Sequence, residues 1–243
     1  MSSVLELESV SNTGEISRAD RLRIEQLYLA SAYAVRDRAP QFVAAAGNIA
    51  AGKTSLLRFL AASGELSAAN AVRHDPDAVM SEIPEYRAET LANPMAAFRR
   101  WEIPARKLAE EILERAVERR CDIVYDRTCA FSDTISFLKR LRLTGYQIRV
   151  CFVWADLEEC LRRAELRAKT SRRSVPEEII VQRAEALRSL VPQYCALANT
   201  FDIFENHDGS GPRFIAGFND GKIYRTDDEQ ALADFKGYFH LNP

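Results

Sequence analysis

The chain has 243 residues, a formal net charge of −2 and a sequence isoelectric point of about 6.0. With 47% hydrophobic positions, it is long enough for one α/β domain with short additions. The charge balance excludes a broad basic field for nucleic acid, and the sequence has no run of about 18 apolar residues that would predict a membrane span.

The five cysteines are odd in number and have no CxxC spacing, which argues against a disulfide framework and against a structural zinc site. This pattern is typical of a reducing compartment. The first residues lack the basic and apolar regions of a signal peptide. We therefore expect a cytoplasmic protein with no nucleic-acid partner and no membrane partner.

The leading part of the chain, residues 1–40, is predicted to be an extension followed by a helix. Residues 1–16 show little periodicity, whereas apolar residues recur at helical spacing from Arg18 to Arg38, and Pro40 ends the pattern. The apolar stripe indicates packing on the rest of the protein, with binding of a partner as the alternative. Residues 41–243 are predicted to form the main domain.

Strands and helices alternate through the main domain. Apolar runs predict strands at Phe42–Ala46, Ala69–Arg73, Asp122–Tyr125, Gln147–Trp154 and Phe201–Phe204. Helical spacing predicts helices at Ser55–Leu60, Pro104–Arg119, Asp133–Leu143, Leu157–Ala168 and Val175–Leu190. This order predicts an α/β fold with a mainly parallel sheet covered by helices on both faces. Asn219-Asp220-Gly221 between two apolar runs adds a small C-terminal hairpin.

A phosphate-binding loop follows the first of these strands. Gly47-Asn48-Ile49-Ala50-Ala51-Gly52-Lys53-Thr54 fits the GxxxxGK[ST] pattern of P-loop NTPases and lies between a predicted strand and a predicted helix. We expect these residues and Ser55 to bind ATP or GTP. Lys53 would balance phosphate charge, and the Thr54 hydroxyl would ligate Mg²⁺. The alternative is a glycine turn before an ordinary helix.

Carboxylates follow two other predicted strands. Asp75 and Asp77 come directly after the strand ending at Arg73, and Asp126 follows Asp122–Tyr125. Ligand sites in open α/β sheets lie at such strand ends. One of the first two could be the general base of a small-molecule kinase, or both could belong to an Asp-Pro turn. Asp126 could contact substrate or order a water on Mg²⁺, with a helix cap as the alternative.

Several of these segments resemble the zeta toxins and their P-loop kinase relatives, over roughly Phe42 to Asn206. A strand after the P-loop leads in that family into a stretch like NPDDFR, which is similar to Asp75-Pro76-Asp77-Ala78-Val79-Met80, and then into HP and an aromatic residue, similar to Ile83-Pro84-Glu85-Tyr86. An EGT stretch at a strand end is matched by Asp126-Arg127-Thr128. Met80 stands where Lys or Arg is usual, Arg127 replaces a glycine, and Ala130 stands where the toxins keep an arginine.

The resemblance implies a P-loop kinase fold and a role for several residues. Asp77 matches the catalytic base, and the sugar-binding glutamate matches Glu110 on the long predicted helix. Asp75, Asp126, Arg127 and Thr128 then belong to the substrate side. Some family members phosphorylate UDP-N-acetylglucosamine, which implies a nucleotide-sugar acceptor and leaves open an antitoxin protein as partner.

A basic stretch from Arg162 to Arg173 follows the clearest buried strand. Ser174-Val175-Pro176-Glu177 has capping-box spacing with proline in the first turn of the next helix, which puts Arg173 on the connection before it. The family resemblance selects Arg167 and Arg173 as the pair that contacts phosphate. For Arg162, Arg163 and Lys169 we favour a salt-bridged helix surface.

These patterns together predict a kinase that moves the γ-phosphoryl group of ATP or GTP to a hydroxyl of a small molecule. A deoxynucleoside kinase is the nearest rival, because the phosphate loop and Asp126-Arg127-Thr128 also resemble motifs of those enzymes. A non-catalytic nucleotide-binding protein is the rival of a different class. It would bind nucleotide without acceptor-dependent turnover.

Overall fold

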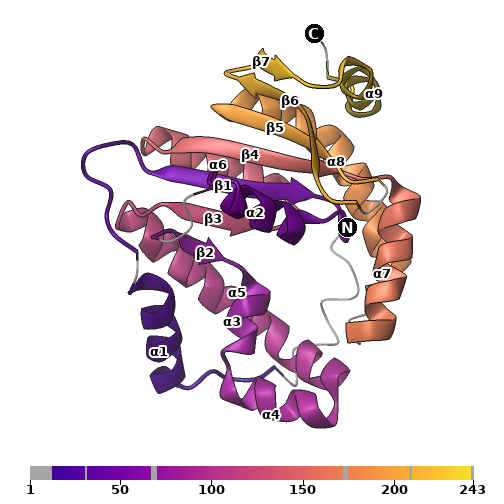
Figure 1. The fold of residues 1–243 in the computed structure, drawn as a ribbon. Coiled ribbons are helices and arrows are strands. Elements are labelled where there is room, and N and C mark those ends of the chain that lie inside the picture. Colours follow the sequence, from indigo (N-terminus) through magenta and orange to yellow (C-terminus); the bar gives the residue numbers. More distant parts are fainter. Residues whose placement is uncertain (1–12, 31, 67–69, 172–174, 208–209, 242–243) are drawn as a thin grey trace.

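A computed structural model describes residues 13–30, 32–66, 70–171, 175–207 and 210–241 (Figure 1). Its centre is a seven-stranded sheet in the order β2-β3-β1-β4-β5-β6-β7. The strands are β1 Gln41–Gly47, β2 Val72–His74, β3 Ile123–Asp126, β4 Gln147–Trp154, β5 Thr200–Glu205, β6 Arg213–Asn219 and β7 Lys222–Thr226. β1 to β5 pair in parallel, and β6 and β7 are antiparallel. The predicted α/β fold with a mainly parallel sheet and a terminal hairpin is confirmed.

Helices cover both faces of this sheet, as predicted. In chain order they are α1 Arg18–Leu29, α2 Lys53–Ala62, α3 Pro76–Ser81, α4 Pro84–Ala92, α5 Pro94–Glu118, α6 Ser132–Leu143, α7 Leu157–Ser171, α8 Glu177–Leu197 and α9 Glu229–Phe239. In Figure 1, α2 lies in front of the sheet, and α6 and α8 lie behind it. None of the described helices is both long enough and apolar enough to cross a membrane.

The alternation of side chains along β1 divides the core in two. Phe42 and Ala44 join the larger apolar cluster, to which α5, α6, α8 and α9 contribute. Val43 and Ala45 face the smaller cluster, formed with α2 and α7. Since both faces of the strand are buried, its sequence is continuously apolar rather than alternating.

The leading helix is shorter than predicted. α1 ends at Leu29, whereas its apolar spacing predicted a helix as far as Arg38. The chain beyond it is extended: Ala34 forms an antiparallel bridge with Cys121, and the Val35 amide donates to the Arg120 carbonyl. Tertiary pairing therefore replaced the end of the predicted helix.

Two helix starts that were predicted from prolines are wrong. α5 begins at Pro94, where the Asn93 side chain accepts a hydrogen bond from the Ala96 amide, and Pro104 lies inside the helix. α8 begins at Glu177 with Pro176 as its N-cap, so the proline is not in the first turn, and Ser174 lies outside the described residues. The cap at Asn93 starts α5 ten residues before Pro104, and Pro176 lies one position outside α8 rather than within its first turn.

Three helices were not predicted. α3 and α4 are short and begin at prolines, and α9 packs Phe235 and Phe239 against Phe152 at ring-centroid distances of 5.7 and 5.3 Å. The hairpin before α9 turns at Asp220 and Gly221, which both have positive φ, of 46° and 77°. This is the backbone that the Asn-Asp-Gly sequence favours.

Parallel pairing brings the carboxyl ends of β1, β2 and β3 together. Ala45 pairs with Asp126, and His74 pairs with Tyr125. The loop after β1, Asp75 after β2 and Asp126 at the end of β3 therefore lie at one edge of the sheet, where open α/β sheets hold their ligands.

Candidate active site

The P-loop has a backbone that needs glycine at two positions. Gly47 has φ 141°, and a Cβ there would lie 2.5 Å from the Val153 carbonyl oxygen. Gly52 has φ 110°, and a Cβ there would lie 2.2 Å from Nδ2 of Asn206. These values combine a left-handed backbone with no room for a side chain. The two glycines of the motif are thus required by the close packing of the loop.

Lys53 is held inside the loop. Its ammonium donates to the carbonyl oxygens of Gly47 at 3.2 Å and Asn48 at 2.8 Å. Burial lowers the pKa of Lys53, and the Asp126 carboxylate opposes that shift. The Asn48 side chain in turn accepts from the Ile49 amide at 2.8 Å. The ammonium is thus held in place by the backbone of the loop itself.

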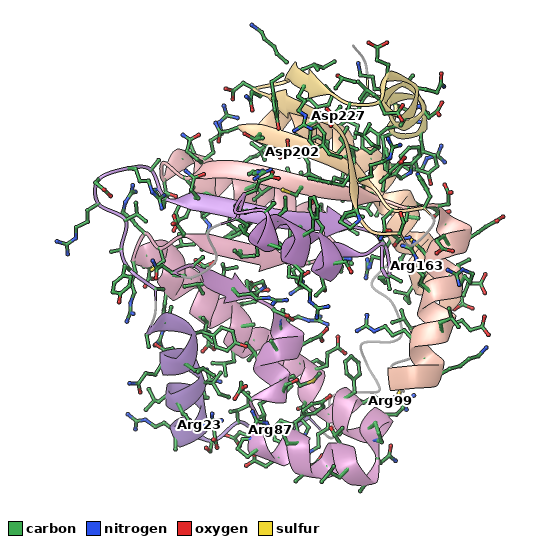
Figure 2. All side chains as sticks on the ribbon, in the orientation of Figure 1. Arg23, Arg87, Arg99, Arg163, Asp202 and Asp227 are labelled. Carbon is green, nitrogen blue, oxygen red and sulfur yellow. The ribbon has the colours of Figure 1, made fainter. Side chains whose placement is uncertain are left out.

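Arg163 supports the loop from α7, where a salt-bridged surface was expected. Its Nη1 donates to the Ala51 carbonyl at 3.3 Å, and its Nη2 donates to the Asn206 carbonyl at 2.7 Å. The Asn206 side chain donates to the same Ala51 carbonyl at 2.9 Å. Arg163 also pairs with Glu159 at 2.6 Å. Figure 2 shows Arg163 on α7 beside the ends of the central strands.

The surface interpretation was wrong for Arg163, whose side chain is only 16% exposed. It holds for its neighbours: Arg162 pairs with Glu159, and Lys169 pairs with Glu165, both in exposed positions on α7. Charge spacing along a helix shows which residues can pair but not which residue turns toward another element. That choice depends on the packing of α7 against the P-loop.

The opposite wall carries the predicted carboxylates. Asp75 caps α3 by accepting from the amides of Asp77 and Ala78, both at 3.2 Å. Burial raises the pKa of Asp75, and the nearby Asp126 charge adds to the rise. Asp77 lies in the first turn of α3 and faces the cavity. Asp75 therefore both caps α3 and lines the site, and the Asp77 carboxylate lines the site beside it.

These walls enclose a cavity of about 560 Å³. Residues of the P-loop and α2, the ends of β2 and β3, and helices α3, α5 and α7 line it: Ile49, Ala50, Gly52, Lys53, Thr54, Ser55, Arg73, Asp75, Asp77, Glu102, Arg106, Asp126, Arg127, Thr128, Arg163 and Arg167. Most of the predicted site residues thus meet in one place. Of the predicted arginine pair, Arg167 is here, and Arg173 lies outside the described residues.

Glu110 lines a second cavity, of about 410 Å³, which shares Arg106 and Arg127 with the first. Glu110 is not among the residues that line the first cavity. Its Oε1 lies 3.5 Å from Nη1 of Arg127 and 3.6 Å from Nε2 of His74. Burial raises the pKa of Glu110, and Arg127 opposes the rise. Aromatic side chains complete this cavity: Tyr125, Phe131 and Phe137.

Buried polar atoms without hydrogen bonds lie beside Glu110, on His74 and Arg127. Within the described residues, neither ring nitrogen of His74 nor Nη1 of Arg127 has a hydrogen-bond partner. His74 stacks on Tyr125 with ring centroids 4.8 Å apart, and burial lowers its pKa to about 3. The imidazole is therefore neutral near pH 7, and Arg127 and Glu110 carry the charge beside it.

Sequence patterns missed three features of the site. Arg73, Arg163 and Asn206 all take part in it, and none belongs to a recognisable motif. Arg73 directly precedes the carboxylate stretch, which could have drawn attention to it. Asn206 lies two residues beyond the predicted strand Phe201–Phe204 and has no local signal, because its contact with Ala51 joins residues 155 positions apart.

The oxygen donors in the first cavity suit Mg²⁺. The described residues contain no group of three or more His, Cys, Asp or Glu side chains that could hold a metal alone. Magnesium in kinases takes one or two protein oxygens together with water and substrate phosphates. The Thr54 hydroxyl and the Asp126 carboxylate line the same cavity and fit that pattern.

Comparison with known proteins identifies the family. The family model described as zeta toxin matches residues 26–209. The chain belongs to the zeta toxin family. The resemblance seen in the sequence is thereby confirmed, and it extends further toward the N-terminus than Phe42. A comparison with curated proteins found no match.

Solved structures share the zeta toxin fold of this chain. The AvrRxo1-ORF1:-ORF2 structure with ATP has a TM-score of 0.69 at 18% identity, and the match covers 89% of this chain and 71% of that chain. A structure from the PezAT chromosomal toxin-antitoxin system of Streptococcus pneumoniae has a TM-score of 0.61 at 17% identity, covering 82% of this chain and 83% of that chain. At these identities the likeness is one of fold.

Proposed function

We propose that this zeta toxin family member is a kinase that transfers the γ-phosphoryl group of ATP or GTP to a hydroxyl of a small molecule. One observation carries the proposal: the P-loop and the carboxylates of Asp77 and Asp126 face a single cavity, which shares Arg106 and Arg127 with a second one. A kinase needs these two adjoining spaces, one for the donor triphosphate and one for the acceptor.

The donor occupies the P-loop end. The residues from Gly47 to Ser55 bind the nucleotide, with backbone amides and the start of α2 directed at the phosphates. Lys53 and Arg167 neutralise charge on the transferring group, and Arg173 is proposed to join them. Mg²⁺, held by Thr54 and through water by Asp126, would supply further positive charge at the β- and γ-phosphates.

The acceptor occupies the second cavity and reaches into the first. Asp77 accepts the proton of the attacking hydroxyl as general base. Glu110 and Arg127 bind acceptor groups where the cavities share Arg127, and Asp75 and Thr128 line the first cavity. The aromatic wall and these charged side chains suit an acceptor with a ring and polar substituents. A nucleotide sugar such as UDP-N-acetylglucosamine is the first candidate.

An antitoxin protein is a proposed partner. The support is family membership and the similarity in fold to a protein of the PezAT toxin-antitoxin system. Co-purification with proteins encoded beside this one would test it. Recovery of the chain alone under conditions that retain such complexes would argue against the partner.

The experiment for the function uses γ-labelled ATP and GTP with a metabolite extract and, separately, with UDP-N-acetylglucosamine. We expect label to move to a small molecule with the wild-type protein and not with Lys53→Ala, in which the transferring phosphate loses its main countercharge. Nucleotide binding without any acceptor-dependent transfer would instead support a non-catalytic nucleotide-binding protein. Transfer to nucleosides alone would support the nucleoside kinase alternative.

A further inference from the structure

Arg73, at the centre of β2, bridges two carboxylates inside the first cavity. Its Nη2 lies 2.9 Å from Oδ2 of Asp126 and 3.1 Å from Oδ2 of Asp75. The Arg73 side chain is 47% exposed, whereas those of Asp126 and Asp75 are 9% and 20% exposed. The carboxylates are therefore fixed in the wall, and the cation between them is the part that can move into the open space.

A cation at this place offsets a strong local repulsion. Burial raises the pKa of Asp75, the Asp126 charge raises it further, and Arg73 opposes both effects. The Arg73 guanidinium supplies a positive charge in contact with both carboxylates. Thr54, Asp126 and Arg73 line the same cavity, and Arg73 occupies an Asp126 oxygen that the proposed magnesium site would use.

Arg73 and a magnesium ion cannot both use Asp126 in the same way. Oδ2 of Asp126 accepts a hydrogen bond from Arg73, and a water bound to the metal would need to donate to the same carboxylate. Two cations a few ångströms apart would also repel each other. Binding of the metal at this end of the cavity thus requires the guanidinium to leave Asp126.

We propose that Arg73 is a built-in counter-cation for the metal end of the cavity. It neutralises Asp75 and Asp126 while no metal and nucleotide are bound, and it gives up Asp126 when Mg²⁺ arrives with the triphosphate. Free divalent metal then binds weakly, because it brings no negative charge to release the arginine. The phosphates of a nucleotide supply that charge and offer the guanidinium a new partner in the same cavity.

This inference rests on the proposed function for the identity of the metal, but its test needs no phosphoryl transfer. Binding of Mn²⁺, a paramagnetic substitute for Mg²⁺, is measured by the loss of the free-ion electron paramagnetic resonance signal without nucleotide. We expect Arg73→Gln to bind Mn²⁺ about tenfold more tightly than wild type, since a competing charge has been removed. Arg73→Lys, which keeps a cation there, should stay near wild type.

Arg23→Gln is the matched control. Arg23 is also 47% exposed and lies between two carboxylates, at 3.5 Å from Asp20 and 3.6 Å from Glu82, on the α1 side of the molecule shown in Figure 2. The Arg23→Gln variant should bind Mn²⁺ with the same affinity as wild type. The double variant Arg73→Gln with Asp126→Asn should lose the gain.

Unchanged or weaker Mn²⁺ binding by folded Arg73→Gln would overturn the proposal, and circular dichroism establishes folding. If that variant does not fold, Arg73→Met, which keeps the aliphatic stem, takes its place with the same expected gain. A gain that survives Asp126→Asn would also overturn the proposal. Failure here would leave the proposed function standing, because kinase activity is measured separately.

Discussion

The P-loop end and the Arg127 end of the site, which we propose as the donor end and the acceptor end, differ in how well their polar groups are satisfied. At the donor end, Lys53 donates to two carbonyls, and the Ala51 carbonyl accepts from both Asn206 and Arg163. Oδ1 of Asn206 is the exception there, buried without a hydrogen bond in the described residues. At the acceptor end, His74 and Arg127 both hold buried polar atoms without such partners.

This difference indicates what each end does. A buried polar atom without a partner destabilises the folded state by about 1–3 kcal/mol. The P-loop end is preorganised, so the proposed donor triphosphate would bind there with little rearrangement. Arg127 lines both cavities, so an acceptor group on a bound ligand would satisfy its Nη1, whereas His74 is buried away from both cavities. Specificity is therefore expected at the acceptor end.

The largest expected effect comes from the proposed base, which belongs to the reaction rather than to either binding end. Asp77→Asn should lower kcat by roughly 10²–10⁴ and leave nucleotide affinity within a few fold, because a general base acts only in the transition state. Steady-state turnover and equilibrium nucleotide binding measure both quantities. Asp75→Asn keeps a side chain that can cap α3. If that variant lost turnover instead, the assignment of the base would be wrong by two residues.

The acceptor end is tested most directly at Arg127. Arg127→Ala should lower kcat/KM for the acceptor roughly 10- to 100-fold, the range for a lost hydrogen bond to a charged group. Nucleotide affinity measured without acceptor should change less than twofold. Arg142→Ala is the control, since Arg142 donates to the Leu197 carbonyl away from both cavities. If Arg127→Ala weakened nucleotide binding as much as acceptor binding, Arg127 would not belong to a separate acceptor end.

The buried His74 predicts a dependence of stability on pH. Burial lowers its folded pKa to about 3 from 6.5, so between these values the unfolded chain binds a proton that the folded chain does not. Stability is lost as pH falls through this window, by about 2 kcal/mol at pH 5. Denaturant unfolding at pH 7 and pH 5 should show this loss in wild type and a smaller one in His74→Phe. Exposed His240→Gln should retain the wild-type loss.

The smallest expected effect concerns the support of the P-loop. Arg163→Ala should weaken nucleotide binding about tenfold, because the Ala51 carbonyl loses one of its donors. Arg163→Lys should recover part of this loss, since an ammonium cannot reach the carbonyls of Ala51 and Asn206 with the same fork. Arg162→Ala is the matched control, because Arg162 pairs with the same Glu159 but points to solvent. If Arg163→Ala and Arg162→Ala lost nucleotide affinity equally and only slightly, Arg163 would not support the P-loop.

Segments with a strong local signal were predicted closely. The strand β4 has the predicted bounds, Gln147–Trp154, and its apolar residues from Val150 to Val153 are all buried. The hairpin turn at Asp220-Gly221 followed from residues that tolerate positive φ. The weaker signals failed: α3 and α4 are too short to show a period, and the end of the helix predicted to Arg38 was extended by its contact with Cys121.

The sequence alone determined the P-loop, because its function resides in the backbone. Glycine at positions 47 and 52, a lysine and a hydroxyl after them specify the loop without reference to the rest of the chain. The carboxylates at strand ends were also evident, because parallel strands deliver their carboxyl ends to one edge.

The tertiary structure alone decided which side chains meet across that edge. Arg73 lies between Asp75 and Asp126 because β2 and β3 are neighbours in the sheet although they are far apart in the chain. Arg163 contacts Ala51 because α7 packs on the same face of the sheet as α2. Local periodicity records only burial and spacing, and these contacts depend on the order of the strands and the rotation of a helix.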